Sequence, residues 1–575
     1  MQADTPSISG KSPRAARFGF WLGLASFVVV LLLPPPASMH AAARAKFARQ
    51  LPVDVAAILE AQGIVEVDPE TDTYRQAEQQ AVRNRARIML STAAVTLLVA
   101  CWWITVAIPI PATSLLPLVL FPAVGVMSVR NAAIPYANSN VFLFMGGFII
   151  ALGIQRWGLH RRIALHIVNL IGTGRSTIVL GFMLASAVLS MWISNTAATM
   201  MMLPIGLAVI GALSELEEQE PHAQRENFAA AIMLGIAYSA SVGGVATPIG
   251  TPPNISFRGQ LAQLFPDAPE ISFGHWMLMF LPLVAVFLPL VWLLLTRVTC
   301  RVSRRPLTAG REIVRRHLAK LGPMRGPEIA MLMIFAATAL LWMARKIPIS
   351  GTDYGWAAML ERLLSPDDGG LHRFRARFVS DATVAVGMAV LLFTIPAGRD
   401  EFGRRQRLMN WETAVQLPWG ILLLFGGGFS LAAALQASGL SAWLGEVFAG
   451  LGITSPPLLV MGTCLMMTFL TEITSNTATT EVMLPIVANA SIAMGANPLL
   501  LMLPATISAS CAFMLPVATP PNAIVFGSGK VSMGRMVRTG IILNLIGVVL
   551  VTLLIYFVTR PLLGIRIDAL PDWAG

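Results

Sequence analysis

Two stretches of the sequence decide the fold: residues 194–206 read SNTAATMMMLPIG, and residues 475–487 read SNTATTEVMLPIV. Nine of the 13 positions are identical, and the second copy begins 281 residues after the first. A single Ser-Asn-Thr triplet carries little information, because these residues commonly cap helices. Two long matching copies instead indicate an internal repeat.

Further pairs of segments support the repeat. Residues 143–159 (LFMGGFIIALGIQRWGL) and 424–440 (LFGGGFSLAAALQASGL) are also 281 positions apart and share nine of 17 residues. Thr-Pro-Pro-Asn occurs at 251–254 and again at 519–522, a shift of 268. The first half therefore has 13 additional residues, the difference between 281 and 268, in the interval that holds the acidic loop 215–226. The preserved order predicts two homologous halves, 91–300 and 328–575.

The composition is that of a membrane protein. Of 575 residues, 55% are hydrophobic and only 12% charged, and the mean hydropathy is +0.69. Apolar stretches at residues 18–33, 91–108, 276–295, 329–343 and 540–558 are each about long enough to cross a hydrocarbon core of about 30 Å. We expect an all-α polytopic protein with roughly ten to twelve spans.

The distribution of charge predicts the orientation. Between residues 301 and 325 the sequence has eight Arg or Lys and one acidic residue, so the segment 301–327 is expected to be a basic cytoplasmic loop. The segment 1–37 is expected to hold a retained first transmembrane helix with a cytoplasmic N-terminus, and residues 38–90 a polar insert outside the bilayer. The net charge of +11 accompanies no nucleic-acid-binding motif, so no nucleic-acid partner is expected.

The repeated motifs suit the binding of ions inside a membrane. Ser, Asn and Thr compete with the backbone for hydrogen bonds, and paired prolines remove two backbone donors, so each motif predicts a helix break. A break in the bilayer leaves N–H and C=O groups that a bound anion and cation can satisfy. The four motifs contain no Arg or Lys, so a cation would have to balance an anionic substrate. Paired interrupted spans predict an inverted-repeat secondary transporter.

Glu472 is a second candidate for ion chemistry. It lies four residues before Asn476, and its counterpart in the first half is Met191. An ionisable residue at membrane depth is a functional candidate by default. The sequence leaves two roles open for it, a structural hydrogen-bond partner or an ion or proton site.

The motifs together resemble the divalent anion/sodium symporter family over roughly residues 92–560. The resemblance is carried by both repeated motif pairs and by WITVAIP (103–109), LLP (115–117), LFP (120–122), GGF (146–148) and LHRRIAL (159–165). Val106 departs from it, since many members have Glu there. The family implies two inverted repeats with broken helices, re-entrant hairpins near 138–155 and 418–436, an elevator-type transport motion and a homodimer in the membrane lipid.

The resemblance also implies the binding residues. The first sodium ion would contact Ser190, Ser194, Asn195 and the Gly250 backbone, and the second Thr471, Thr474, Asn476 and the Ala518 backbone. The substrate carboxylates would meet Asn195, Thr196 and Thr251 on one side and Asn476, Thr477, Thr519 and Pro520 on the other.

We therefore expect a sodium-coupled transporter of C4-dicarboxylates such as succinate, malate and fumarate in the inner (plasma) membrane. It would have no catalytic residues and no organic cofactor. The alternatives are a sodium-independent dicarboxylate exchanger and a sodium-coupled sulfate or citrate transporter. An intramembrane enzyme is disfavoured because the sequence shows no nucleophile–base pair or HExxH-type motif. A channel is disfavoured because paired breaks favour a closed midplane site.

Overall fold

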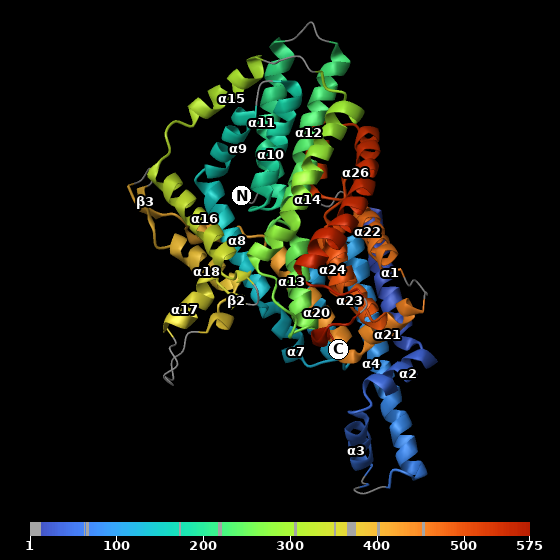
Figure 1. Ribbon diagram of the computed structural model, residues 1–575. Helices are drawn as coiled ribbons and strands as arrows, with labels where there is room; N and C mark the ends of the chain where they lie inside the picture. The colour runs from blue at the N-terminus through green and yellow to red at the C-terminus, as the bar shows by residue number, and fades with distance from the viewer. Residues whose placement is uncertain are drawn as a thin grey trace.

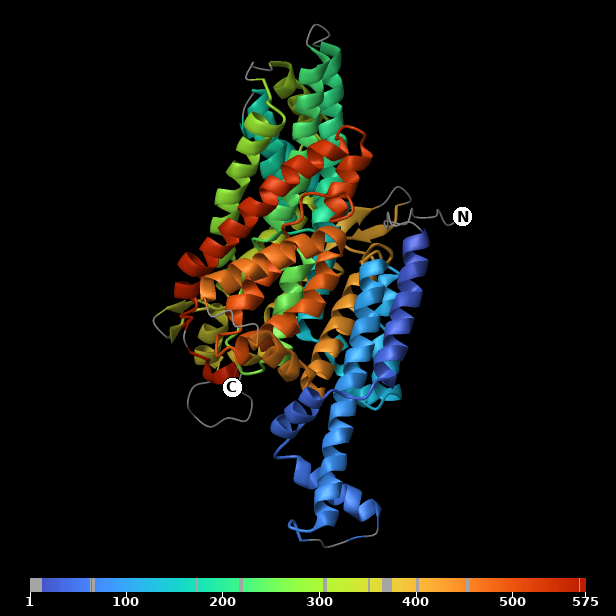
Figure 2. The ribbon, with the colours of Figure 1, turned by 90° about the vertical axis from the view of Figure 1, so that its right-hand side faces the viewer.

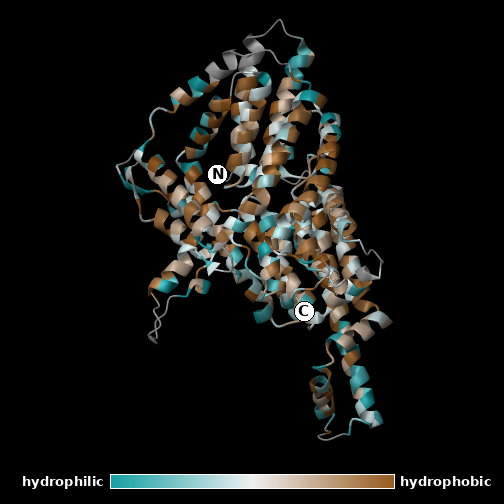
Figure 3. Ribbon diagram, in the orientation of Figure 1, coloured by the Kyte–Doolittle hydropathy of each residue, from teal (hydrophilic) through white to brown (hydrophobic). Residues whose placement is uncertain are grey.

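The computed structural model describes residues 13–62, 64, 68–171, 174–216, 221–303, 308–349, 352–364, 375–399, 403–450, 455–567 and 569–574. These residues form a helical molecule whose central helices are mainly hydrophobic (Figures 1 and 3). Eight of its helices are long and apolar enough to cross a membrane. This is fewer than the roughly ten to twelve spans expected, because several apolar segments are divided into shorter helices at the repeated motifs.

The N-terminal region contributes a projecting arm. It comprises α1 (Pro13–Leu32), α2 (Ala37–Lys46), α3 (Leu51–Ala61) and α4 (Asp72–Thr105). Arg85 of α4 binds Asp54 of α3 through two hydrogen bonds, of 2.7 and 2.9 Å. Figures 1 and 2 show α3 and the start of α4 extending away from the body. Because α4 is continuous, the boundary expected at residue 90 lies inside a helix; residues 1–12 lie outside the described chain.

Each half contains the same succession of helices. The first is α8 (Ser139–Arg156), α9 (Leu159–Ile171), α10 (Arg175–Ser190), α11 (Asn195–Leu216), α12 (His222–Gly244), α13 (Pro252–Leu264) and α14 (Phe273–Leu293), extended by η2 (Leu294–Thr299). The second is α20 (Trp419–Ser438), α21 (Leu440–Ala449), α22 (Pro456–Ile473), α23 (Asn476–Ala493), α24 (Leu499–Ala509), α25 (Pro520–Gly527) and α26 (Met533–Leu554), extended by η4 (Ile555–Thr559).

Shorter elements join these repeats. Before the first repeat lie α5 (Ile110–Thr113), α6 (Leu116–Ala123), α7 (Val129–Ala133) and η1 (Ile134–Ala137). Between the repeats lie α15 (Thr308–Lys320), α16 (Gly326–Ala344), α17 (Trp356–Leu364), η3 (Ala376–Phe378), α18 (Asp381–Leu392) and α19 (Trp411–Ala414). Two antiparallel strand pairs lie in the same region: β1 (Pro348–Ile349) with β2 (Thr352–Asp353), and β3 (Pro396–Arg399) with β4 (Arg405–Arg407). The chain ends with α27 (Arg560–Leu562) and η5 (Asp572–Ala574).

The glycine-rich segments are not hairpins, contrary to the expectation for residues 138–155 and 418–436. Each forms one continuous helix, α8 or α20. Their glycines instead allow close helix contacts. A Cβ on Gly146 would lie 2.6 Å from the Ala385 carbonyl carbon, and one on Gly426 would lie 2.1 Å from a ring carbon of Tyr136.

The hairpins are centred on the Ser-Asn-Thr motifs. Along α12, Gly235 faces Met183 of α10 and Gly243 faces Ala187, so α10 and α12 run in the same direction. Gly206 of α11 faces α12 near Met233, whereas Asn195, where α11 begins, faces Gly244. Helix α11 therefore runs antiparallel to α12 and to α10, and the chain reverses at residues 191–194, the first tip. Helices α22 and α23 also both pack against α24, and residues 474–475 form the second tip.

The two halves interlock through the helices that follow Thr-Pro-Pro-Asn. Helix α12 ends before residues 245–251, the first break, and α24 ends before residues 510–519, the second break. After the first break, α13 packs against α23 and α24 of the second repeat. After the second break, α25 packs against α11 and α12 of the first. Through this reciprocal exchange, the helix that follows each break packs against helices of the other repeat.

Candidate functional site

The first tip and first break gather oxygen atoms around one asparagine. Ser190 Oγ lies 2.5 Å from a side-chain amide atom of Asn195. The same amide atom lies 3.2 Å from the carbonyl oxygens of both Gly250 and Ala240. Ser190 closes α10, Asn195 opens α11, Ala240 belongs to α12 and Gly250 lies in the first break. Three helices and the first break therefore meet at one point.

The Asn195 amide can be oriented in two ways, because its oxygen and nitrogen are assigned from the surrounding hydrogen bonds. With nitrogen at this point, its two hydrogens have three oxygens within hydrogen-bonding distance, those of Gly250, Ala240 and Ser190. With oxygen there, a cation would be needed to hold it beside two carbonyl oxygens. Carbonyl, amide and hydroxyl oxygens are ligands that hard cations prefer, so the residues present fit a sodium ion.

Two glycines make this convergence possible. A Cβ on Gly250 would lie 2.4 Å from the Gly244 carbonyl oxygen and 2.9 Å from the Ser190 carbonyl oxygen. A Cβ on Gly244 would lie 2.4 Å from Asn195 Oδ1. The backbone of the break thus contacts the tip where a larger residue would separate them. Ser194, also expected at this sodium site, caps α11, since its Oγ accepts a hydrogen bond from Ala197 N at 3.3 Å.

The second tip holds a related set of oxygens. Thr474 Oγ1 lies 2.5 Å from Thr479 Oγ1, and Thr471 Oγ1 donates to the Thr468 carbonyl at 3.1 Å. Asn476 Oδ1 is buried and has no hydrogen-bond partner among the described residues. A buried acceptor without a partner, on the helix that follows these hydroxyls, is compatible with a bound cation. Ala518 is buried in the second break, but no hydrogen bond between described residues joins it to these side chains.

The asparagines of Thr-Pro-Pro-Asn shape both breaks, a role that the sequence reasoning missed. Asn254 Nδ2 donates to the carbonyls of Gly244 (3.2 Å) and Thr247 (2.8 Å). Asn522 Nδ2 donates to those of Ala512 (3.2 Å) and Leu515 (3.1 Å). The acceptors lie ten and seven residues earlier in each case. Conservation of the asparagine between the two halves was the available signal.

The predicted substrate residues lie at helix N-termini. Thr251 and Thr519 precede α13 and α25 with nearly the same backbone angles, φ −140° and −138°. Both helices begin with two prolines, which have no N–H group, so an anion at these helix starts would be attracted by the helix dipole rather than by free backbone donors at the first two positions. Thr251 and Thr519 are buried, Thr196 and Thr477 are partly exposed, and Pro520 is exposed. The threonines and Pro520 therefore come from the starts of α11, α13, α23 and α25.

Glu472 joins the second tip to the second break. Its carboxylate accepts hydrogen bonds from Met514 N (2.9 Å), Leu515 N (3.0 Å) and Asn544 Nδ2 (2.7 Å). In the first repeat, the Thr247 hydroxyl donates to the Met191 carbonyl. Met191 and Thr247 are the counterparts of Glu472 and Leu515 under the two repeat shifts. Corresponding positions of the tip and the break are therefore hydrogen-bonded to each other in both halves. This geometry supports the role of Glu472 as a structural hydrogen-bond partner.

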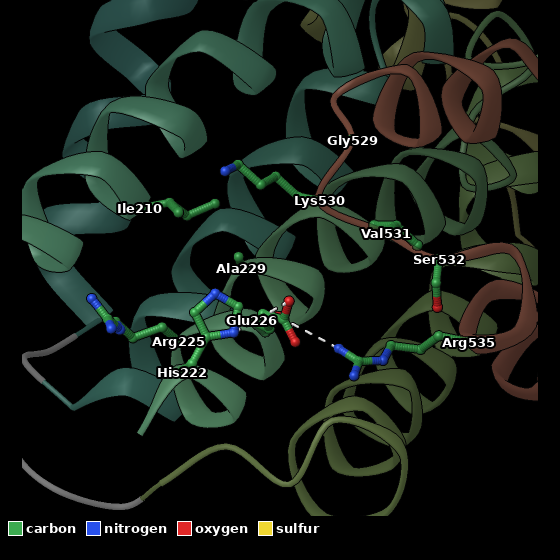
Figure 4. Close-up of a pocket in the computed structure, with 10 residues that line it drawn as sticks. All are labelled: Ile210, His222, Arg225, Glu226, Ala229, Gly529, Lys530, Val531, Ser532 and Arg535. Carbon is green, nitrogen blue, oxygen red and sulfur yellow. Dashed lines mark hydrogen bonds and ion pairs between the residues drawn. The ribbon is translucent and has the colours of Figure 1, made fainter. Parts of the chain in front are cut away.

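A cavity of about 500 Å³ lies elsewhere and is not this site. Figure 4 shows its lining: Ile210, His222, Arg225, Glu226, Ala229, Gly529, Lys530, Val531, Ser532 and Arg535. Arg535 donates to the Glu226 carbonyl at 3.4 Å. The α12 residues that line this cavity precede the first break by about 20 positions, which corresponds to roughly 30 Å along the helix.

The architecture defines the class of protein. Interrupted helices in corresponding positions of two inverted repeats, with backbone oxygens and helix N-termini at the interruptions, are the arrangement of a secondary transporter. Residues 82–565 match the family model described as the sodium:sulfate symporter transmembrane region. The chain therefore belongs to the divalent anion/sodium symporter family, and it is a transport protein rather than an enzyme.

Named relatives are similar over most of their length. The sodium-dependent dicarboxylate transporter SdcS of Staphylococcus saprophyticus is 43% identical over 475 residues, 82% of this chain and 87% of the relative. SdcS of Staphylococcus aureus is 44% identical over 476 residues, 83% of this chain and 87% of the relative.

Solved structures show a weaker likeness. The YdaH transporter of Alcanivorax borkumensis is 16% identical with a TM-score of 0.47, over 73% of this chain and 85% of that one. MtrF of Neisseria gonorrhoeae is 14% identical with a TM-score of 0.46, over 74% and 82%.

Proposed function

We propose that this protein is a sodium-coupled importer of C4-dicarboxylates such as succinate, malate and fumarate, located in the plasma membrane with its N-terminus in the cytoplasm. The observation that carries the proposal is the convergence of Ser190, Asn195 and the Gly250 carbonyl at the first break. The names of the two SdcS relatives support both the ion and the substrate class.

Two sodium sites would supply the charge that the substrate site lacks. The first would be formed by Ser190, Ser194, Asn195 and the Gly250 carbonyl, and the second by Thr471, Thr474, Asn476 and the Ala518 carbonyl. The dianion would lie between Asn195, Thr196 and Thr251 on one side and Asn476, Thr477, Thr519 and Pro520 on the other. Since the four motifs contain no Arg or Lys, the dianion would bind well only after sodium, which is the physical basis of coupling.

Transport would follow an elevator motion within a homodimer. In this scheme the tips and breaks move together, because they contact one another through Glu472 and Leu515 in one half and Thr247 and Met191 in the other. Keeping each break fixed to its tip preserves the ion sites while the solute crosses.

Uptake of radiolabelled succinate into proteoliposomes tests the proposal. We expect uptake to cease when external sodium is replaced by potassium or choline. We also expect Asn195→Ala and Asn476→Ala each to abolish sodium-dependent uptake, while Asn489→Ala in the same helix as Asn476 retains it. Asn489 is a suitable control because its amide donates to the Pro485 carbonyl within α23, at 2.8 Å.

Other outcomes would identify the alternatives. Uptake unaffected by sodium but dependent on a preloaded dicarboxylate would establish an exchanger. Sodium-driven uptake that sulfate or citrate inhibits more strongly than succinate would reassign the substrate, since neutral amide and hydroxyl groups can bind several anions. Robust uptake in either asparagine variant would refute the site.

A further inference from the structure

A fully buried carboxylate lies between the two repeats and has no part in the site described above. Glu481 of α23 is 0% exposed. One of its oxygens accepts a hydrogen bond from the Ser256 hydroxyl, and Oε2 accepts one from Gln260 Nε2 at 2.6 Å. Both donors belong to α13, the helix that crosses from the first repeat. Gln260 Nε2 also donates to the Gly428 carbonyl of α20 at 3.2 Å.

No cationic side chain balances this carboxylate in the described part of the chain. Glu481 is the only charged residue of α23, and α20 and α24 have none. Arg258, the one charged residue of α13, binds Asp381 at 2.9 Å instead. On the other neighbours, Glu472 and Cys464 of α22 and Glu446 of α21 are not cations. The charged and titratable residues of α4 are Asp72, Tyr74, Arg75, Glu78, Arg83, Arg85, Arg87 and Cys101, and none of them forms an ion pair with Glu481.

The carboxyl lies one helical turn from the proposed substrate site. Glu481 follows Thr477 by four residues and therefore lies on the same face of α23. Ser256 likewise follows Pro252, the first residue of α13, by four residues. A charge at this position opposes the dianion that the starts of α13 and α23 would bind. Isolated buried carboxylates are costly and are usually neutralised, so substrate binding and neutralisation of Glu481 favour each other.

The surroundings admit a proton but not a metal ion. Gln260 must direct its nitrogen toward Glu481, because the same atom donates to the Gly428 carbonyl. A Cβ on Gly428 would lie 2.1 Å from Glu481 Oε2, so the carboxylate has no free space on that side. A proton on the other oxygen is accommodated readily, since the Ser256 hydroxyl can reverse from donor to acceptor.

We propose that Glu481 is a proton-binding site that is neutral when the dianion and sodium occupy the breaks. This inference rests on the proposed function and adds a coupled proton to it. A proton from the side that admits the substrate binds the carboxylate, and the same proton leaves on the side that releases it. The first repeat has Met200 at the corresponding position, so the chain has one such site rather than two.

Sodium-driven uptake of fumarate at several pH values tests this inference, because both fumarate carboxyls stay ionised between about pH 6 and pH 8. We expect wild-type uptake to fall as pH rises and Glu481→Gln, which mimics the neutral carboxyl, to transport without this dependence. Glu446→Gln is the matched control, an exposed glutamate on α21, and should keep the wild-type profile. A wild-type pH profile in Glu481→Gln would overturn the inference and leave the transport function intact.

A direct proton measurement separates the remaining outcomes. In weakly buffered detergent solution, at a pH high enough to ionise Glu481 in the substrate-free protein, fumarate added with sodium should draw up to about one proton into each wild-type chain and none into Glu481→Gln. If Glu481→Gln is inactive, Ser256→Ala provides the second variant, and its pH profile should shift because one hydrogen bond to the carboxyl is lost. If the wild type transports no dianion, the proposed function fails. The infrared absorption of protonated carboxyls in substrate-free protein at about pH 5 then tests Glu481 directly: we expect a weaker band in Glu481→Gln than in wild type, and equal bands would exclude Glu481.

Discussion

Replacing Gly250 by alanine tests whether close contact between the first tip and first break forms a sodium site. The new Cβ would lie 2.4 Å from the Gly244 carbonyl oxygen, so that group must move by about 1 Å to reach an ordinary contact. Gly250 is not among the residues with positive φ, so alanine fits its backbone conformation and the effect is steric. Overpacking of this kind costs about 1–3 kcal/mol, which corresponds to roughly 5- to 150-fold weaker sodium binding.

The assay is the sodium concentration that gives half-maximal succinate uptake in proteoliposomes. Ala518 provides a matched control, because it occupies the position in the second repeat that Gly250 occupies in the first. Ala518→Gly removes a methyl group and should cost at most about 1 kcal/mol, less than about a sixfold change in sodium dependence. Wild-type sodium dependence in Gly250→Ala would refute the reasoning, since the converging oxygens would then tolerate displacement.

Two further predictions concern stability, each measured by thermal unfolding in detergent. Glu472→Gln places an amide nitrogen where the carboxylate accepts hydrogen bonds from the second break, so it should destabilise the protein by about 1–3 kcal/mol; an unchanged melting temperature would show that this connection is not structural. Asp381→Asn should cost about 3–5 kcal/mol, because Arg258 and Arg345 are both buried and both bind Asp381. The half-buried ion pair of Asp54 and Arg85 is the control, and Asp54→Asn should cost at most about 1 kcal/mol of stability. Equal losses of stability in the two variants would contradict the larger contribution assigned to the buried Asp381.

The sequence located the breaks because the repeat marks them twice. Asn195 and Asn476 begin α11 and α23, and Pro252 and Pro520 begin α13 and α25, as the two motifs predicted. The hairpins were misplaced because glycine in an apolar segment has two physical meanings, a turn or a close helix contact. Gly146 and Gly426 have the second, and only the packing partners in the folded protein distinguish them.

Glu481 is a feature of the fold that the sequence alone did not reveal. Its counterpart is Met200, so comparison of the repeats gave no reason to examine it. Its significance comes from Ser256 and Gln260, which lie more than 220 residues earlier in the chain, as the separations of 225 and 221 show. No local pattern reveals that two helices so distant in sequence enclose one carboxyl.

The exchange of α13 and α25 between the repeats also constrains biogenesis. A ribosome completes α13 long before α23 and α24, the helices against which it packs. Until they arrive, Ser256 and Gln260, both buried in the final structure, lack Glu481, their hydrogen-bond partner on α23. The first half therefore remains an incomplete assembly in the membrane until the second half has been inserted. A chaperone or translocon that covers α13 during this interval would determine how much functional protein a cell obtains.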